Sequence, residues 1–315
     1  MNMAANDTVT IVDVGLRDGL QNIGPFVPTA AKIELAEGLY AAGIRRIEVG
    51  SFVSASAVPQ LRDTADLLKA LNWMDPFNLQ VLVPTVRRVQ QALDAGARHL
   101  CFVVSVSAAH NQANVNRTPS ESLAEFERSL SLLSNDTKLR LNIATAFDCP
   151  FTGRVHEAAT LDLLERLLAL SADAEICLCD TTGKAAPDHV ARLFASCTTR
   201  FPQVSAWAFH GHDTYGLGLA NVAAAFGQGI RTIDAAFAGL GGCPFAPGAT
   251  GNVATEDVVW MFERMGIHTQ VDLEKLLPVA CEGAALPGGA PGGRVRIAST
   301  GASKLNERKC YATQA

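Results

Sequence analysis

The chain has 315 residues, of which 48% are hydrophobic and only 18% are charged, so it can bury a large core. Its formal net charge of −5 at pH 7 leaves no basic face for phosphates, which argues against nucleic acid as a partner. No apolar run reaches the roughly 18 residues of a membrane span, and the first residues contain no signal or targeting pattern. The eight cysteines form no C-x-x-C pair, which is typical of reduced thiols. We therefore expect a cytoplasmic protein without a membrane partner.

Short β-branched segments alternate with longer segments of helical periodicity along the whole chain. The expected strands are residues 9–14, 46–49, 79–83, 99–104, 140–145, 175–179, 206–209 and 232–237. The expected helices are residues 30–42, 58–71, 86–95, 120–133, 156–170, 187–199, 218–229 and 256–265. Eight strand–helix units close a (β/α)₈ TIM barrel, which is the α/β fold that we predict. An open, doubly wound sheet is the alternative, but no G-x-G-x-x-G motif follows the first strand.

The end of the chain differs in composition from the rest. Residues 286–293 read L-P-G-G-A-P-G-G, a poor core former, and the residues after them are basic and polar. We therefore assign residues 1–285 to the catalytic barrel domain and residues 286–315 to a short C-terminal extension, either partly disordered or lid-like.

Unusual polar residues follow several expected strands, at the end where barrel enzymes place their active sites. Arg17 and Asp18 follow the first strand, and Glu48 and Ser51 lie at the end of the second. The others are Asp180 after the sixth strand, His210 and His212 after the seventh, and Cys243 and Asn252 after the eighth. Glu48 and Asp180, taken singly, are equally consistent with ordinary loop acids. Because independent loops supply these side chains, we expect one site at the mouth of the barrel.

The sequence F-H-G-H-D carries the strongest local signal for a metal site. His210 and His212 occupy alternate positions at a strand end, so both imidazoles should face the mouth of the barrel. The alternative is one core histidine beside one exposed histidine. With Asp18 opposite, nitrogen and oxygen donors favour Mg²⁺ or Mn²⁺, with Zn²⁺ less suited. Arg17 either forms a surface ion pair with Asp18 or binds an anion, such as a carboxylate or a developing enolate.

Residues 239–253 read G-L-G-G-C-P-F-A-P-G-A-T-G-N-V and surround Cys243 with five glycines and two prolines. A run of this composition cannot continue a strand or a helix. Long loops are often functional, and the alternative is a mobile surface loop with an incidental cysteine.

These motifs together resemble those of the 3-hydroxy-3-methylglutaryl-CoA lyase family, metal-dependent barrel enzymes with Claisen-type chemistry. Matching segments recur in family order over residues 9–268. They are G-L-R-D-G-L-Q-N (15–22), I-E-V-G-S-F-V-S (47–54), V-P-Q (58–60), C-D-T-T-G (179–183), F-H-G-H-D-T-Y-G (209–216), A-G-L-G-G-C-P-F (238–245) and G-N-V-A-T-E-D (251–257). Several are long and specific, so the chain is identified as a member of this family.

The resemblance implies a role for each matching residue. The residues that match ligands of a divalent cation, Mg²⁺ or Mn²⁺, are Asp18, His210, His212 and Asn252. His210 also stands among the implied catalytic residues, with Arg17 on the enolate oxygen, Glu48 and Asp180 as acid–base or positioning carboxylates, and Cys243 as the proton-shuttling thiol. The implied substrate-binding residues are Arg17, Gln21 and Ser51. The ordinary pKa of a thiol, near 8.5, suits a group that must give and recover a proton.

Four departures from the family pattern fall around the acyl pocket. Cys177 stands where the family commonly has serine, and the stretch after Phe52 lacks the usual lysine or large aromatic residue. The loop after the fourth strand follows the family's S-A-S-E pattern only loosely, and the C-terminal N-R-K-T segment is replaced by the proline–glycine tail. We therefore expect standard cleavage machinery with an unusual acyl pocket.

The resemblance implies retro-Claisen cleavage of a 3-hydroxy-3-substituted acyl-CoA, most simply of 3-hydroxy-3-methylglutaryl-CoA to acetyl-CoA and acetoacetate. One alternative is a lyase for a different or longer-branched 3-hydroxyacyl-CoA, and another is a Claisen-condensing synthase. A non-catalytic acyl-CoA-binding scaffold is the non-enzyme alternative, which intact Arg17, Cys243 and metal ligands disfavour. By the same resemblance we expect a homodimer or a higher homo-oligomer.

Overall fold

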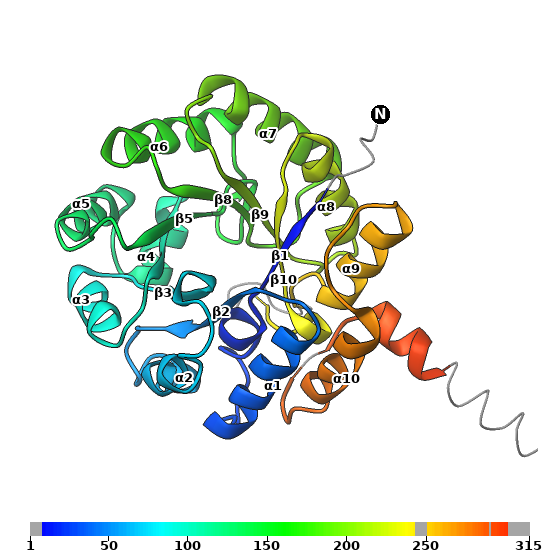
Figure 1. Cartoon of the computed structure of the whole chain (residues 1–315). Coiled ribbons are helices and arrows are strands. Elements are labelled where there is room, and N and C mark those ends of the chain that lie inside the picture. The colour runs from blue at the N-terminus through cyan, green and yellow to red at the C-terminus, as the bar shows by residue number, and fades with distance from the viewer. Residues whose placement is uncertain (1–7, 243–250, 290, 302–315) are drawn as a thin grey trace, which may run out of the picture.

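The computed structural model describes residues 8–242, 251–289 and 291–301 of the chain. Eight parallel strands form a closed barrel, with helices arranged around its outside (Figure 1). Around the barrel the strands follow the order β1 (Thr10–Asp13), β10 (Thr232–Ala235), β9 (Trp207–Gly211), β8 (Glu175–Asp180), β5 (Lys138–Ala144), β4 (His99–Ser105), β3 (Leu79–Leu82) and β2 (Arg46–Ser51). The predicted TIM barrel is therefore confirmed.

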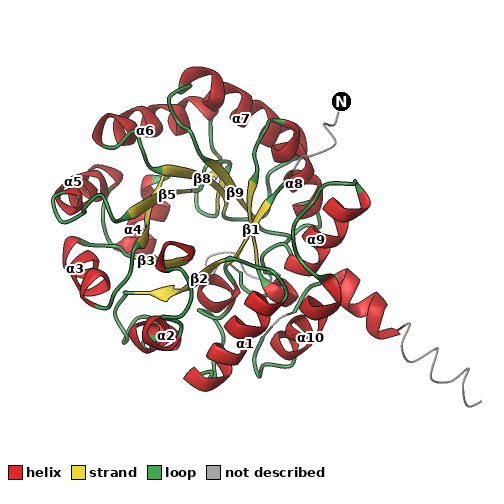
Figure 2. Ribbon diagram, viewed as in Figure 1, coloured by secondary structure: helices red, strands yellow, loops and turns green. Residues whose placement is uncertain are grey.

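Helices surround the strands, as Figure 2 shows, and ten of them, α1 to α10, lie wholly within the described ranges before residue 290. They are α1 (Thr29–Ala41), α2 (Thr64–Ala70), α3 (Val86–Asp94), α4 (Ala108–Val115), α5 (Pro119–Leu130), α6 (Glu157–Leu170), α7 (Pro187–Arg200), α8 (Gly218–Gly227), α9 (Thr255–Arg264) and α10 (Leu273–Ala284). Across the described part of the chain, none of the helices combines the length and the apolar character needed to cross a lipid bilayer.

The barrel strands are buried on both faces because their side chains alternate between the barrel interior and the layer of helices. Apolar residues of five strands are accordingly inaccessible to solvent: Val12, Ile47, Leu100, Leu141 and Phe209. The β-branched and aromatic composition that predicted these strands thus reflects burial in a parallel sheet.

The end of β2 has an irregular register that places part of the site. Its pairing with β3 shifts between Glu48 and Gly50. A Cβ on Gly50 would lie 2.2 Å from Oγ1 of Thr64, so only glycine fits at this approach of β2 to α2. Thr64 Oγ1 accepts a hydrogen bond from the Ser51 N–H at 3.0 Å, which fixes the strand end where Ser51 faces the barrel mouth.

Several elements differ from the sequence-based expectation. The expected helix at 58–71 is divided into a 3₁₀ turn, Pro59–Leu61, and α2, and Pro59 begins the turn because it needs no N–H partner there. α4 was not predicted, because its sequence A-A-H-N-Q-A-N-V lacks an apolar stripe. α10, which packs against α1 and α9, contains Pro278 and was also not predicted. A short hairpin of β6 (Asp148–Cys149) and β7 (Gly153–Arg154) is a further addition after β5.

The described part of the C-terminal extension contacts the barrel. Gly292 N–H donates to the Ala238 carbonyl at 2.7 Å. Residues 294–301 are helical, and the Asp257 carboxylate accepts the N–H groups of Arg294 and Val295 at 2.9 and 2.8 Å. Asp257 therefore satisfies donors at the start of this helix in the way that an N-cap does. The domain boundary at residue 285 stays a prediction.

A buried lysine ties α1 to the loop before α2. Lys32 is inaccessible to solvent, and its Nζ lies 2.7 Å from Asp63 Oδ1 while donating to the Gln60 carbonyl at 2.5 Å. We expect Lys32→Met to destabilise the fold by about 3 kcal/mol, because it leaves the Asp63 charge buried without its partner. Urea denaturation measures this loss. Lys275→Met changes an exposed lysine that pairs with Asp272, and should cost less than about 1 kcal/mol. Equal losses for the two variants would contradict the assignment.

The Asp13 carboxyl at the end of β1 should make stability depend on pH. Burial raises its pKa to about 7, against the hydrogen bonds from Thr255 Oγ1 at 2.7 Å and Gly15 N–H at 2.8 Å. Because the folded-state pKa lies above the ordinary value of 3.8, Asp13 costs stability as pH rises from about 4 to 7. Asp13→Asn removes the charge, keeps the Gly15 N–H on its amide oxygen and lets its NH₂ donate to Thr255 Oγ1 in place of accepting from it, so the variant should gain on the order of 3 kcal/mol over wild type at pH 8 and nothing at pH 4. Urea denaturation of both proteins at the two pH values measures the difference, and an equal difference at both would refute the assignment.

Candidate metal-dependent active site

A single wide turn after β1 presents Arg17 and Asp18. Residues Gly15–Gly19 form one π-helical turn, in which the N–H groups of Asp18 and Gly19 both point to the Val14 carbonyl. A Cβ on Gly15 would lie 2.4 Å from the Phe237 ring, so the turn can enter the barrel mouth only with glycine at this position. π-Helical turns occur frequently at functional sites, and this one is buried throughout.

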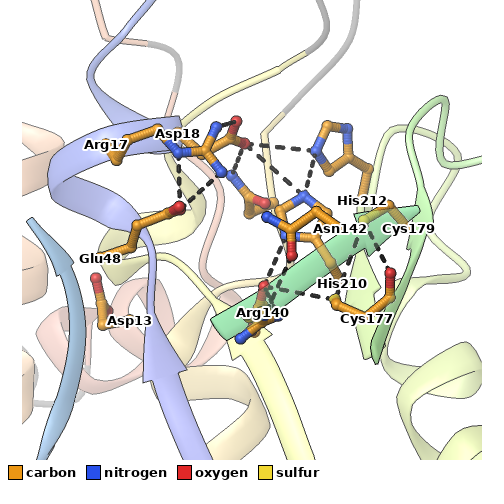
Figure 3. A network of polar contacts seen from close by, with 12 residues as sticks. Asp13, Arg17, Asp18, Glu48, Arg140, Asn142, Cys177, Cys179, His210 and His212 are labelled. Carbon is orange, nitrogen blue, oxygen red and sulfur yellow. Dashed lines mark hydrogen bonds and ion pairs between the residues drawn. The ribbon is translucent and has the colours of Figure 1, made fainter. Parts of the chain in front are cut away.

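Asp18, His210 and His212 lie together at the mouth of the barrel (Figure 3). Oδ2 of Asp18 is 3.9 Å from His210 Nε2 and 3.6 Å from His212 Nε2, and the two imidazole nitrogens are 3.1 Å apart. All three side chains are buried. The expected convergence of η1 (Gly15–Gly19) with the end of β9 is therefore observed.

Asn252 completes the group from the far end of the chain. Its Nδ2 donates to Asp18 Oδ2 at 2.8 Å and to the Leu240 carbonyl at 2.9 Å. Its Oδ1 is buried and has no hydrogen-bond partner among the described residues. A buried amide oxygen without a donor beside a carboxylate and two imidazoles is a donor set that fits a divalent cation of the Mg²⁺ or Mn²⁺ type. The four ligand roles themselves stay predictions.

The charges around this group favour an ionised Asp18. Burial raises the pKa of Asp18, but the Arg17 guanidinium and both histidines outweigh burial and hold the pKa well below its usual range. Oδ1 of Asp18 accepts from Arg17 Nη1 at 2.5 Å and from Gln21 Nε2 at 2.9 Å. Oδ2, which accepts from Asn252 Nδ2, faces the two imidazoles, and a cation would bind on that side.

Glu48 lies beneath Arg17 and holds its guanidinium. Arg17 donates from Nε to Glu48 Oε2 at 2.7 Å, and Nη2 lies 2.7 Å from the same oxygen. Burial raises the pKa of Glu48, although the Arg17 charge opposes this rise. Arg17 reaches the cavity of the site and Glu48 does not, so the geometry fits Glu48 better to positioning than to direct contact with a substrate.

Asp180 is close to the site but turns away from the cavity. Its carboxylate oxygens accept from the Ala185 N–H at 3.3 and 3.2 Å, and burial raises its pKa to about 7. Its neighbours Cys179 and Thr181 line the cavity, and Asp180 does not, as the alternation of side chains along a strand requires. The structure therefore gives Asp180 a loop-stabilising contact, and its acid–base role stays a prediction.

A cavity of about 750 Å³ opens beside the group of four residues. Gln21 and Ser51, both predicted to bind substrate, line it, and Ser51 Oγ donates to the Leu82 carbonyl at 3.0 Å. Cys243 lies outside the described residues. The preceding residue, Gly242, lines the cavity, and its carbonyl accepts from Asn22 Nδ2 at 2.7 Å.

Two charged residues of the barrel interior were missed by the sequence analysis. Asp234 Oδ2 lies 3.1 Å from His210 Nδ1, and both Asp234 oxygens accept from Arg140 Nη2 at 2.7 Å. Arg140 is among the largest fully buried side chains of the structure. Each residue lies inside an expected strand, 140–145 or 232–237, and a charged residue at such a position is rarely buried unless it is paired. The presence of a charged residue within an expected strand was therefore the feature of the sequence that could have indicated this buried pair.

Asp234 fixes the proton of His210 on Nδ1 and thereby leaves Nε2 free to face a cation. We expect Asp234→Asn to weaken Mn²⁺ binding by about 10–100-fold, the usual cost of changing a carboxylate behind a metal-binding histidine. Isothermal titration of the purified variant with Mn²⁺ measures the change. Asp13→Asn is the matched control, because it also neutralises a buried aspartate of the barrel but touches none of the four residues. Equal Mn²⁺ affinities for the two variants would contradict this role.

The barrel and the grouped acid, imidazole and amide side chains are typical of metal-assisted barrel enzymes. A family model described as HMGL-like matches residues 8–281, and the chain belongs to this family. It is therefore a carbon–carbon lyase of the acyl-CoA type. It is 42% identical over 86% of its length to (R)-citramalyl-CoA lyase of Chloroflexus aurantiacus, of which 88% is covered.

Two further comparisons cover nearly the whole chain. Hydroxymethylglutaryl-CoA lyase of Pseudomonas mevalonii is 39% identical over 92% of this chain and 96% of its own length. A solved HMG-CoA lyase of Acinetobacter baumannii, in complex with coenzyme A and 3-methylmalate, superposes with a TM-score of 0.86 at 38% identity. The superposition covers 95% of this chain and 97% of that one.

Proposed function

We propose that this protein cleaves a short, branched 3-hydroxyacyl-CoA by a retro-Claisen reaction that depends on Mg²⁺ or Mn²⁺, with 3-hydroxy-3-methylglutaryl-CoA as the first candidate substrate. The observation that carries the proposal is Arg17 at the cavity wall, bonded to Asp18 beside the two histidines. A cationic donor held next to side chains that suit a divalent cation supports the proposal, because the reaction needs both groups.

The reaction breaks the bond between C2 and C3 of the acyl group. The 3-hydroxyl loses its proton to a base and becomes a ketone, while the electron pair of the broken bond forms the enolate of acetyl-CoA. A divalent cation bound at the site would lower the pKa of the substrate hydroxyl. Arg17 donates to the enolate oxygen, and Glu48 holds the guanidinium in position for that contact.

A proton must then reach the enolate carbon. We assign this step to Cys243, in the glycine-rich loop whose neighbour Gly242 lines the cavity. Asp180 has a pKa of about 7, which suits a group that accepts the hydroxyl proton near neutral pH. Its oxygens bond the Ala185 N–H in the present arrangement, so this role requires the loop at 181–185 to move.

Citramalyl-CoA is the second candidate substrate, because a citramalyl-CoA lyase is 42% identical to this chain. The acyl groups of the two candidates differ by one methylene in the arm that ends in the carboxylate. Cleavage of citramalyl-CoA would release pyruvate, and cleavage of 3-hydroxy-3-methylglutaryl-CoA would release acetoacetate. The keto acid released therefore distinguishes the two substrates.

The test is an incubation of the purified protein with each thioester, Mn²⁺ and a reducing agent, followed by quantification of acetyl-CoA and both keto acids. We expect chelator-sensitive release of acetyl-CoA with an equal amount of one keto acid. Folded, Mn²⁺-loaded protein that cleaves neither thioester would overturn the proposal. Condensation of acetyl-CoA with the keto acid, without net cleavage, would instead support the synthase alternative.

A further inference from the structure

Asn142 on β5 presents a polar group to the cavity beside the predicted metal site. Its side chain lines the cavity, as do those of His210 and Cys179. Its Oδ1 accepts a hydrogen bond from Nε of Arg140 at 3.0 Å, within the same strand (Figure 3). The side chain is nearly buried, with 7% of its surface exposed.

The contact with Arg140 decides which end of the Asn142 amide faces the cavity. A guanidinium can only donate hydrogen bonds, so the amide oxygen must face Arg140 and the amide NH₂ must point away from it. Within the described part of the chain the Asn142 side chain makes one hydrogen bond, the one that its Oδ1 accepts from Arg140, and its NH₂ donates none. Because Asn142 lines the cavity, this NH₂ is available to donate to an acceptor on a bound ligand.

The Arg140 guanidinium is itself fixed in place by two carboxylates, so it keeps the Asn142 amide in this orientation. Its Nη2 bonds both carboxylate oxygens of Asp234 at 2.7 Å, and Nη1 lies 3.2 Å from Glu175. Asp234 in turn contacts His210. The same arginine therefore sets the direction of the Asn142 amide and supports the carboxylate behind a predicted metal ligand.

Two other neutral polar side chains of the cavity already use donors within the protein. Ser51 Oγ donates to the Leu82 carbonyl, and Gln21 Nε2 donates to Asp18. Around Asn142, the nearby strands contribute apolar lining from Val103 and Ala144. Asn142 is thus an oriented donor on a mostly apolar part of the wall.

We propose that the Asn142 NH₂ binds the carboxylate of the substrate's acyl group, at the end opposite the thioester, and so selects acyl-CoA substrates that carry this carboxylate. This inference rests on the proposed function and adds a specificity-determining residue to it. A protein donor to a charged acceptor in a binding cavity gives strong discrimination against ligands that lack the acceptor, because the donor then loses its partner.

The test compares a ligand that has the carboxylate with one that lacks it. Asn142→Asp keeps an oxygen for Arg140 but loses the donor, and Asn142→Leu removes the amide without adding charge. For both variants we expect kcat/KM on 3-hydroxy-3-methylglutaryl-CoA, or on citramalyl-CoA if wild type prefers it, to fall by about 100-fold. The inhibition constant of acetyl-CoA, which lacks the carboxylate, should change by less than threefold in Asn142→Leu.

Asn114→Asp is the matched control, because it makes the same chemical change on α4 at another part of the cavity wall. For this control we expect both kcat/KM on the thioester substrate and the inhibition constant of acetyl-CoA to change by similar factors from wild type. The inference is overturned if wild type cleaves its thioester and the Asn142 variants either keep wild-type kcat/KM or weaken the substrate and acetyl-CoA by the same factor. Wild type that cleaves neither thioester overturns the proposed function instead, so the two failures are distinguishable.

Discussion

Replacing Arg17 with glutamine should lower kcat by about a thousandfold, the upper range for loss of one preorganised donor to a developing oxyanion. Arg17 makes three contacts that glutamine cannot reproduce together, two with Glu48 and one with Asp18. Glutamine can still donate one neutral hydrogen bond, but it carries no charge to stabilise the enolate. Single-turnover measurement of acetyl-CoA release gives the rate of the chemical step directly.

The Arg17→Gln result also separates an enzyme from a binding scaffold. A scaffold would show no turnover in the wild-type protein and would bind acyl-CoA equally well with either residue. The control is Arg192→Gln, which removes an exposed arginine of α7 that pairs with Asp188 one turn earlier in the same helix. Circular dichroism of both variants checks folding. If the folded Arg17→Gln variant had a kcat within tenfold of the wild-type value, the role assigned to Arg17 would be contradicted.

Asp18→Asn should weaken the binding of Mn²⁺ by at least about 100-fold, since changes behind a ligand already cost up to that amount. Asp18 is the carboxylate of the predicted site, with Oδ2 within 4 Å of both imidazole nitrogens. Asparagine removes the negative charge while nearly preserving the volume. Turnover should fall in parallel at fixed Mn²⁺ and recover partly as the Mn²⁺ concentration is raised.

Electron paramagnetic resonance of free Mn²⁺ during titration measures this affinity without reference to turnover. Asp188→Asn, an exposed aspartate at the start of α7, is the matched control and should bind Mn²⁺ as wild type does. Unchanged affinity in Asp18→Asn would mean that the cation binds elsewhere, and the assignment of the four residues would then be wrong.

The barrel and the convergence of its site were predictable because both depend on local patterns. Alternation along β9 predicts that His210 and His212 point the same way, and strand direction places them at the same end of the barrel as Asp18. No feature outside those patterns was needed to expect the four polar residues together, and the structure brings them together.

The interior charges could not be predicted in the same way. Arg140 and Asp234 are 94 positions apart, and they meet only because β5 and β10, three places apart in the strand order, both contribute side chains to the interior of one closed barrel. That meeting depends on strand order and tilt, which periodicity does not specify. The orientation of the Asn142 amide depends in turn on Arg140. The specificity role proposed for Asn142 therefore could not be inferred from the sequence.

Asp180 illustrates a different limit. Its place at the end of β8 is as expected, but strand alternation points its carboxylate away from the cavity that Cys179 and Thr181 line, and the Ala185 N–H in the following turn bonds it there. α4 likewise forms where the sequence has no apolar stripe, because Ser107 accepts the His110 N–H at its start and Asn116 ends it in the left-handed region. These features depend on capping contacts and tertiary packing more than on periodicity.

The most direct test of the whole assignment is the release of acetyl-CoA from 3-hydroxy-3-methylglutaryl-CoA and from citramalyl-CoA by metal-stripped protein, as Mn²⁺ is added stepwise. The assignment predicts no release without the cation and turnover that saturates at one Mn²⁺ per chain, with acetoacetate or pyruvate formed in equal amount. Full turnover by stripped protein in excess chelator, or none from folded protein at saturating Mn²⁺, would contradict it.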